Sequence, residues 1–164
     1  MESSKPISTA QILGVLLPVL SSGIGGGESL IAIPALAGLT PAERVRAFRG
    51  LYNIGAIRSP TLGVVATSVL AYNSWLSYSA SGEQSIWKLY AVAAISTLAV
   101  APFTVFLMGP TNTRLLLLAN KADKGEEISD GDVAAQLGKW KFLNYTRYLL
   151  PLGASILALR AILS

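Results

Sequence analysis

The chain of 164 residues contains no cysteine and no histidine. These absences exclude disulfide bonds, zinc sites of the usual Cys and His type, and any catalytic relay that pairs serine or cysteine with histidine. Charge is also scarce, because only 13% of the residues are charged whereas 52% are hydrophobic. This composition is too apolar for an ordinary soluble protein. We therefore expect a lipid bilayer as solvent, and chemistry based on carboxylate, guanidinium, amide, hydroxyl and aromatic groups.

The formal net charge of +4 does not indicate a nucleic-acid partner. The basic residues lie at the edges of apolar stretches and form no separate patch, so they are better explained by membrane topology. Residues 1–5 hold no basic run and no small-residue cleavage site, and the apolar stretch that follows is too long for a signal peptide. The sequence therefore predicts that this stretch is a retained first transmembrane helix.

Four apolar stretches are long enough to cross a bilayer, which takes roughly 20 mainly apolar residues. They cover about residues 10–38, 50–72, 86–108 and 142–163. The predicted fold is all-α, a single integral membrane domain over residues 1–164 built as a four-helix transmembrane bundle. Most of the Lys and Arg residues lie in the connections 39–49 and 109–141. By the positive-inside rule, these first and third connections are expected to be cytoplasmic, with membrane lipid around the spans.

Two local signals predict where helices begin. Thr40-Pro41-Ala42-Glu43 has the pattern of a capping box with proline at the first helical position. Ser129-Asp130-Gly131-Asp132 is a weaker start signal, so the fourth helix is expected to begin before the membrane and to extend over about 34 residues, on the order of 50 Å. Between the third and fourth spans, residues 121–131 are rich in charge and glycine and predict a solvated loop.

The first apolar stretch contains the run Gly25-Gly26-Gly27. Glycine weakens a helix by roughly 1 kcal/mol per residue. The run therefore predicts either a local break in this helix or a ligand against its backbone. Small residues four apart, such as Gly23 and Gly27, are also typical of close helix packing.

Several charged or polar residues fall inside the predicted spans. Counted from the cytoplasmic ends, Thr104 and Arg147 lie at a depth of about 8 Å and Arg58 at about 12 Å, so the three are expected to share one cavity. Glu28 is expected to lie deeper, at about 15 Å and near the midplane. A charge at such a depth costs roughly 2.5–3.5 kcal/mol, which favours a functional role.

One face of the fourth span combines a cation, an amide and aromatic rings. Trp140, Asn144 and Arg147 share this face, with Tyr148 beside them. In the third span, the segment 102–112 contains two prolines that are expected to break the helix and to expose carbonyl groups.

A purely structural interpretation of these residues stays open. In it, Glu28 pairs with Arg58 or Arg147 as a clamp between helices, whereas Trp140 and Tyr148 anchor the chain at the membrane interface. The combination of all these groups favours function.

These motifs resemble a known family. Pro102-Phe103-Thr104, then the segment 108–112, and then Trp140, Asn144 and Arg147 are similar to the signature of the anthrone oxygenase family of small four-helix membrane proteins. The segment 52–55 and the glycine-rich first span are similar to that family too. The resemblance implies oxidation of a polyketide-derived anthrone to an anthraquinone by molecular oxygen, with no metal or flavin cofactor. It also implies an endoplasmic reticulum membrane as the location.

The resemblance and the residue chemistry together suggest roles for the buried groups. Arg147, with Asn144 or Asn112, is expected to stabilise the oxyanion that develops at the ketone, and Glu28 is expected to remove the proton. An anthrone is flat and aromatic, so stacking side chains are also expected. The predicted substrate-binding residues are Trp140, Asn112, Thr104, Phe103, Arg58, Tyr52 and Tyr148.

Two other classes of function remain open from the sequence. A small membrane carrier would also have broken helices and charges near the midplane, but it predicts an inverted repeat that these two halves lack. A structural membrane partner would use the buried charges only as clamps, and would bind no small aromatic ligand.

Overall fold

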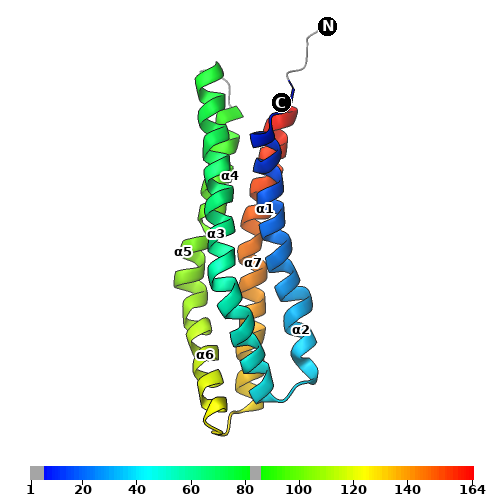
Figure 1. Ribbon diagram of the computed structural model, residues 1–164, viewed down its shortest axis with the longest axis vertical. Coiled ribbons are helices and arrows are strands. Elements are labelled where there is room, and N and C mark those ends of the chain that lie inside the picture. Colours follow the sequence, from blue (N-terminus) through cyan, green and yellow to red (C-terminus); the bar gives the residue numbers. More distant parts are fainter. Residues whose placement is uncertain (1–5, 82–85) are drawn as a thin grey trace.

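The computed structural model describes residues 6–81 and 86–164, and within these ranges the chain forms helices and no strands. The helices join into four long rods, each apolar and long enough to cross a membrane: Thr9–Gly38, Pro41–Ala80, Ile86–Asp123 and Asp130–Leu163. The rods run alternately down and up, so that the start of the first rod and the end of the fourth lie at the same end of the bundle (Figure 1). The all-α fold with four membrane-length helices is confirmed.

The rods contain π-helical and 3₁₀ segments as well as α-helix. The first rod comprises α1 (Thr9–Gly27), the π-helix η1 (Glu28–Ala32), α2 (Ile33–Ala35) and the 3₁₀ turn η2 (Leu36–Gly38). The second is the single helix α3 (Pro41–Ser81). The third comprises α4 (Ile86–Leu98), α5 (Val100–Phe103), the π-helix η3 (Thr104–Met108) and α6 (Gly109–Asp123). The fourth is α7 (Asp130–Leu163).

Helix starts follow the local signals in the sequence. At the start of α3, the Thr40 amide donates to Glu43 Oε2 at 2.8 Å, and the Glu43 amide donates to Thr40 Oγ1 at 3.4 Å. These two bonds form the capping box. Ser129 caps α7, which has the expected 34 residues. The connection 109–141 is mostly helical, however, because α6 continues to Asp123 and α7 begins at Asp130.

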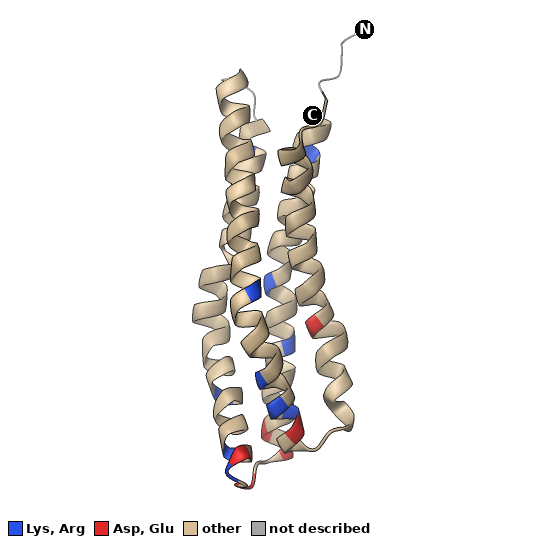
Figure 2. Ribbon diagram, viewed as in Figure 1, with Lys and Arg blue, Asp and Glu red and all other residues tan. Residues whose placement is uncertain are grey.

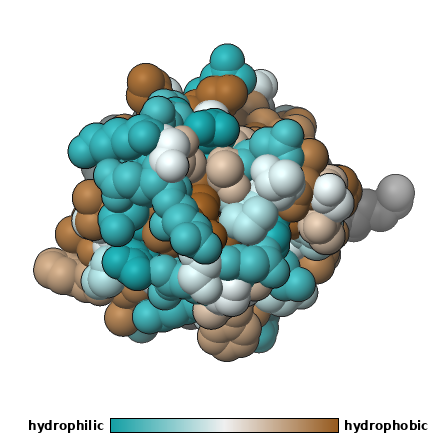
Figure 3. All heavy atoms as spheres, turned by 90° about the horizontal axis from the view of Figure 1, so that it is seen from below, coloured by the Kyte–Doolittle hydropathy of each residue, from teal (hydrophilic) through white to brown (hydrophobic). Residues whose placement is uncertain are grey.

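The lower end of the bundle is held together by ion pairs between helices, and most charged residues lie there (Figure 2). The pairs are Arg44 with Asp130, Arg46 and Arg49 with Asp123, and Arg114 with Asp132. Viewed from below, hydrophilic side chains cover much of this end and hydrophobic ones lie around it (Figure 3). These interhelical pairs explain why the rods extend beyond the predicted spans.

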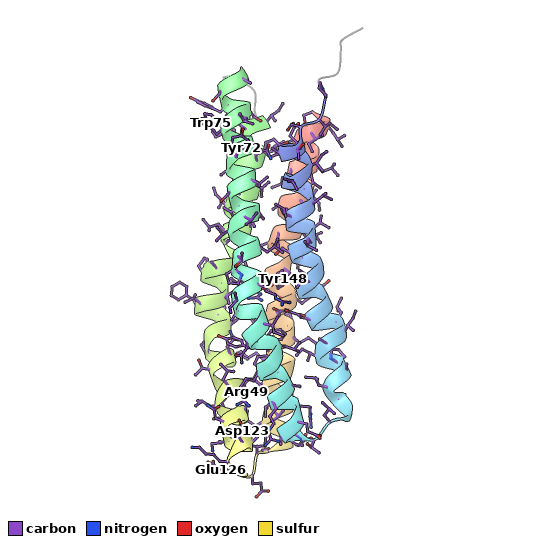
Figure 4. All side chains as sticks on the ribbon, in the orientation of Figure 1. Arg49, Tyr72, Trp75, Asp123, Glu126 and Tyr148 are labelled. Atoms are coloured by element: carbon purple, nitrogen blue, oxygen red, sulfur yellow. The ribbon has the colours of Figure 1, made fainter. Side chains whose placement is uncertain are left out.

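An aromatic pair marks the other end of the apolar band. Tyr72 and Trp75 on α3 have ring centroids 6.0 Å apart and are both exposed, as expected of aromatic side chains at a membrane interface. They lie near the upper end, whereas Arg49 and Asp123 lie near the lower end (Figure 4). From Arg49 to Tyr72 the helix rises about 35 Å, close to the thickness of a bilayer.

The predicted helix breaks are wrong, because the helices widen where breaks were expected. The run Gly25-Gly26-Gly27 is α-helical and leads directly into the π-helix η1. The third rod continues through Pro102 and passes into the π-helix η3 before Gly109. A π-helical turn accommodates an irregularity in the hydrogen-bond ladder without ending the helix, and such turns are frequent at functional sites.

Candidate active site

A polar layer lies between two apolar parts of the core. On α7, Trp140 belongs to the lower apolar cluster and Ala154 to the upper one, and the buried residues Asn144 and Arg147 lie between them. The two π-helices contribute Glu28, Ser29 and Thr104 to the same layer. The polar groups that the sequence scatters over three spans therefore meet at one level.

Asn144 ties α7 to the first rod. Its side-chain Nδ2 donates to the Gly25 carbonyl at 2.9 Å, to Ser29 Oγ at 2.8 Å and, at 3.4 Å, to Glu28 Oε2. The residue is fully buried, and its Oδ1 has no hydrogen-bond partner among the described residues. Because its donors are already used by the protein, Asn144 positions Glu28 and is not a free donor for a substrate oxyanion.

Arg147 is held by hydroxyl groups. Its Nη1 donates to Thr104 Oγ1 at 2.7 Å and its Nη2 donates to the Tyr148 hydroxyl at 3.1 Å. The guanidinium carbon also lies 4.6 Å from the centroid of the Tyr148 ring. Its Nε is buried and finds no partner in the part of the chain that the structure describes. A guanidinium has five N–H donors, so Arg147 retains donors for an anion.

The Tyr148 ring packs against the backbone of α1. A Cβ atom added to Gly25 would lie 1.8 Å from a ring carbon of Tyr148, so only glycine leaves room for the ring there. The Ser22 hydroxyl donates to the Tyr148 carbonyl at 3.0 Å and fixes the same contact. Gly25 thus serves close packing against a side chain, which is the physical reason for a glycine at this position.

Trp140 is a core residue and not an interfacial anchor, because only 6% of its surface is exposed. Its Nε1 donates to Asn112 Oδ1 at 2.9 Å, and its ring meets Phe48 edge-on at a centroid distance of 5.3 Å. Tyr148 is equally buried, with 3% of its surface exposed. The anchor interpretation is therefore wrong for both residues.

Glu28 forms no ion pair among residues 6–81 and 86–164. The interpretation of Glu28 as one half of an interhelical clamp is therefore wrong for the described residues. Its carboxylate is held instead by the Asn144 amide, at 3.4 Å. A carboxylate without a cationic partner remains available as a base.

Two cavities meet at Glu28 and Gly55. The larger, of about 280 Å³, lies between α1, α3 and α7 and is lined by Ser21, Ile24, Glu28, Ile54, Gly55, Arg58, Ser59, Leu62 and Tyr148. The smaller, of about 40 Å³, is lined by Glu28, Leu51, Tyr52, Gly55, Ala56, Met108, Asn112 and Trp140. The larger cavity is close to the lower end of the roughly 300–1,000 Å³ range of small-molecule sites.

The structure places the remaining candidate residues around these cavities. Tyr52 lines the smaller cavity, and Phe103 packs against the lower core. Arg58 lines the larger cavity, whereas Thr104 borders a separate groove between α3 and α5. Arg58 and Thr104 thus line different cavities, in contrast to the expected single cavity.

Ser29 was not singled out from the sequence, and Gly55 was noted only as part of the segment 52–55 that resembles the family. Ser29 is fully buried and accepts from Asn144, and Gly55 lies 3.7 Å, measured from an added Cβ, from Glu28 Oε1. The signal that could have identified Ser29 is its place directly after the intramembrane carboxylate Glu28. The signal for Gly55 was its place in that segment.

Comparison with known proteins identifies the family. The sequence profile described as anthrone oxygenase matches residues 48–157. An anthrone oxygenase of Aspergillus fumigatus is 32% identical over 93% of this chain and 92% of its own. This chain belongs to the anthrone oxygenase family. An anthrone oxygenase of Paecilomyces divaricatus is 33% identical over 92% of this chain and 93% of its own. A noranthrone monooxygenase of Aspergillus flavus is 32% identical over 79% of this chain and 62% of its own.

The match to the anthrone oxygenase family covers most of the polar layer. Residues 48–157 include Arg58, Thr104, Asn112, Trp140 and the Asn144 to Tyr148 face of α7. The first rod, with Glu28, lies before the matched residues, so its part in the site rests on the contacts described above. No solved structure matches this chain.

Proposed function

We propose that this protein oxidises a polyketide-derived anthrone to an anthraquinone with molecular oxygen and without a metal or flavin cofactor. The observation that carries the proposal is the Glu28 carboxylate, which lines both cavities of a largely apolar site and is held by the Asn144 amide at 3.4 Å. The names of the relatives, anthrone oxygenase and noranthrone monooxygenase, support an anthrone as the substrate. A flat aromatic ring system suits a narrow apolar cavity.

Proton removal is the first step of the proposed reaction. The central-ring methylene of the anthrone loses a proton to the Glu28 carboxylate, and the substrate becomes an electron-rich enolate. Negative charge then develops on the ketone oxygen, which requires a donor or a cation nearby. Tyr148 lines the cavity and accepts a hydrogen bond from Arg147, so its own hydroxyl hydrogen is free to serve that oxygen. Arg147 supports this donor with its positive charge.

Oxygen completes the reaction without an external reductant. The enolate passes one electron to molecular oxygen, and the resulting radical and superoxide combine at the deprotonated carbon to form a peroxide. Loss of water from the peroxide leaves the second ketone of the anthraquinone. One anthrone and one O₂ therefore give one anthraquinone and one water, and the substrate supplies all the electrons. The protein supplies binding, deprotonation and charge stabilisation.

The membrane location completes the proposal. We place the chain in the endoplasmic reticulum membrane, with the connections 39–40 and 124–129 between rods on the cytoplasmic side. The support is the concentration of Lys and Arg at that end of the bundle. An apolar substrate dissolved in the bilayer would then reach the site from the lipid.

Oxygen uptake with emodin anthrone tests the function. The purified, metal-free protein in detergent is expected to form quinone well above the spontaneous rate, and chelators are expected to leave that rate unchanged. Glu28→Gln is expected to lower the rate by roughly 10²–10⁴-fold, the range for loss of a general base. Arg147→Lys is expected to lower turnover while leaving expression intact. The guanidinium donates to the hydroxyls of Thr104 and Tyr148 from one planar group, and an ammonium does not reproduce this geometry.

A matched substitution controls for the loss of a guanidinium elsewhere. Arg114→Lys changes a residue that pairs with Asp132 at 2.6 Å at the exposed end of the bundle, and its turnover is expected to equal that of the parent protein. Background rates with folded parent protein would refute the oxygenase proposal. Unchanged turnover in Arg147→Lys would remove Arg147 from the mechanism.

A further inference from the structure

Arg58 and Arg160 are the two arginines of the described residues whose guanidinium has no hydrogen-bond or ion-pair partner, and of these two Arg58 lines the larger cavity. Four arginines at the lower end pair with aspartates, and Arg147 bonds to Thr104 and Tyr148. The Arg58 guanidinium, by contrast, has no hydrogen bond or ion pair to any residue that the structure describes. It is nevertheless one of the residues that line the larger cavity.

Arg58 is exposed on α3, at a depth where an unpaired charge is costly. Arg58 is nine residues after Arg49 on α3, which places it about 13 Å above the ion pairs of the lower end and within the apolar band. Arginine does not lose its proton in proteins, so the charge persists at this depth. Unpaired charges inside a membrane segment are rare, and they mark the paths and sites of substrates.

The position of Arg58 relative to Glu28 is suited to a bound ligand. Gly55 lies beside the Glu28 carboxylate, with 3.7 Å between an added Cβ and Oε1. Arg58 follows Gly55 by three residues on the same helix, so it lies on the same face and about 4.5 Å further along the axis. A flat ligand with its reactive carbon at Glu28 would therefore point one ring edge at the guanidinium.

We propose that Arg58 binds an anionic substituent on the substrate, a carboxylate carried by an outer ring of the anthrone, and so makes this protein selective for acidic anthrones. This proposal rests on the proposed oxygenase function and adds the substrate class. A guanidinium donates two parallel hydrogen bonds to a carboxylate, and the opposite charges strengthen that contact. The charge of Arg58 is then neutralised only when the acidic substrate is bound.

Competition between two substrates tests the selectivity. Emodin anthrone and the same anthrone bearing an outer-ring carboxylate are mixed, and the ratio of their kcat/KM values is measured for the parent protein in neutral detergent. The parent is expected to favour the acid by roughly 10- to 100-fold, the effect of a charge-assisted hydrogen-bond pair. Arg58→Gln is expected to bring the ratio close to one, and Arg58→Lys to give an intermediate value.

Arg160→Gln is the matched control. Arg160 is an exposed arginine near the end of α7, outside the cavities described above, and its substitution is expected to leave the ratio unchanged. The proposal is overturned if the parent shows no preference, or if Arg58→Gln slows both substrates equally. It is also overturned if Arg58 serves a lipid headgroup. In that case, adding phosphatidylglycerol to phosphatidylcholine nanodiscs would stabilise the parent protein but not Arg58→Gln. The ratio of the two kcat/KM values would then be the same in the parent and in Arg58→Gln.

Equilibrium binding separates this proposal from the oxygenase function. Anthraquinone and anthraquinone-2-carboxylate are stable ligands, and their binding is followed by quenching of tryptophan fluorescence. Tighter binding of the acid that disappears in Arg58→Gln would support the anion site even if turnover of both anthrones stayed at background. Rapid turnover with equal binding of both quinones would overturn the anion site and leave the oxygenase function intact.

Discussion

The contact between Gly25 and the Tyr148 ring provides the sharpest test of the packing described here. In Gly25→Ala, the new methyl group would lie 1.8 Å from one ring carbon and 1.9 Å from the next. Ordinary contacts between carbon atoms are about 3.5–4.0 Å, so the ring must move by roughly 2 Å. Tyr148 is 3% exposed and its hydroxyl is held by Arg147 at 3.1 Å, so such a shift would break this hydrogen bond.

The expected cost follows from these contacts. Forcing a methyl group into a packed site destabilises by about 1–3 kcal/mol. Loss of the hydrogen bond between Arg147 and the Tyr148 hydroxyl adds about 1.5–3 kcal/mol, because the donor is charged. The higher helix propensity of alanine offsets about 1 kcal/mol of this loss. The free energy of unfolding is therefore expected to fall by about 1.5–5 kcal/mol.

Reversible unfolding in mixed detergent micelles, titrated with dodecyl sulfate, measures this change. Gly23→Ala is the control on the same helix, because an added Cβ at Gly23 meets nothing within 4 Å. That variant is expected to be as stable as the parent or slightly more stable. In the double variant Gly25→Ala/Tyr148→Ala, the methyl group no longer meets a ring, so the two effects are expected to be strongly non-additive. Equal stability of Gly25→Ala and Gly23→Ala would refute the argument.

Two further predictions concern stability. Trp140→Phe removes the donor to Asn112, at present 2.9 Å away, and leaves a buried acceptor unpaired, so it is expected to cost about 1–3 kcal/mol in the same titration. Trp75→Phe, at an exposed ring, is its control and should change little; equal losses in both would contradict the argument. Ser129→Ala removes the N-cap of α7 and is expected to cost about 1 kcal/mol, visible as a lower Tm of the detergent-solubilised protein. An unchanged Tm would show that this cap contributes nothing.

Local patterns in the sequence were sufficient for the membrane fold and for the helix starts. The apolar stretches predict four membrane-length helices because a bilayer requires a minimum length of apolar helix, whatever the partners of that helix are. The Thr40 capping box and the Ser129 cap are equally local, because each involves backbone groups only three residues away. These features were predictable without knowledge of the tertiary structure.

The site could be predicted only in part. The sequence pointed to Glu28, Asn144 and Arg147 because a polar group inside an apolar span is conspicuous. It did not reveal that the Asn144 side chain donates its hydrogen bonds to the first rod, or that Arg147 donates a hydrogen bond to the Tyr148 hydroxyl. It also placed helix breaks where the ladder widens into π-helix, because glycine and proline indicate irregularity but not its form.

What the sequence by itself determined is therefore the number of spans, their starts and the polar residues within them. Only the tertiary structure decided which of these residues meet, such as Asn144 with Glu28 and Trp140 with Asn112. The physical reason lies in the solvent. Lipid tails are as apolar as the side chains of the core, so hydrophobicity does not set the rotation of each helix in a membrane. Close contacts such as that of Gly25 with Tyr148 set it instead, and these contacts exist only once the helices have packed.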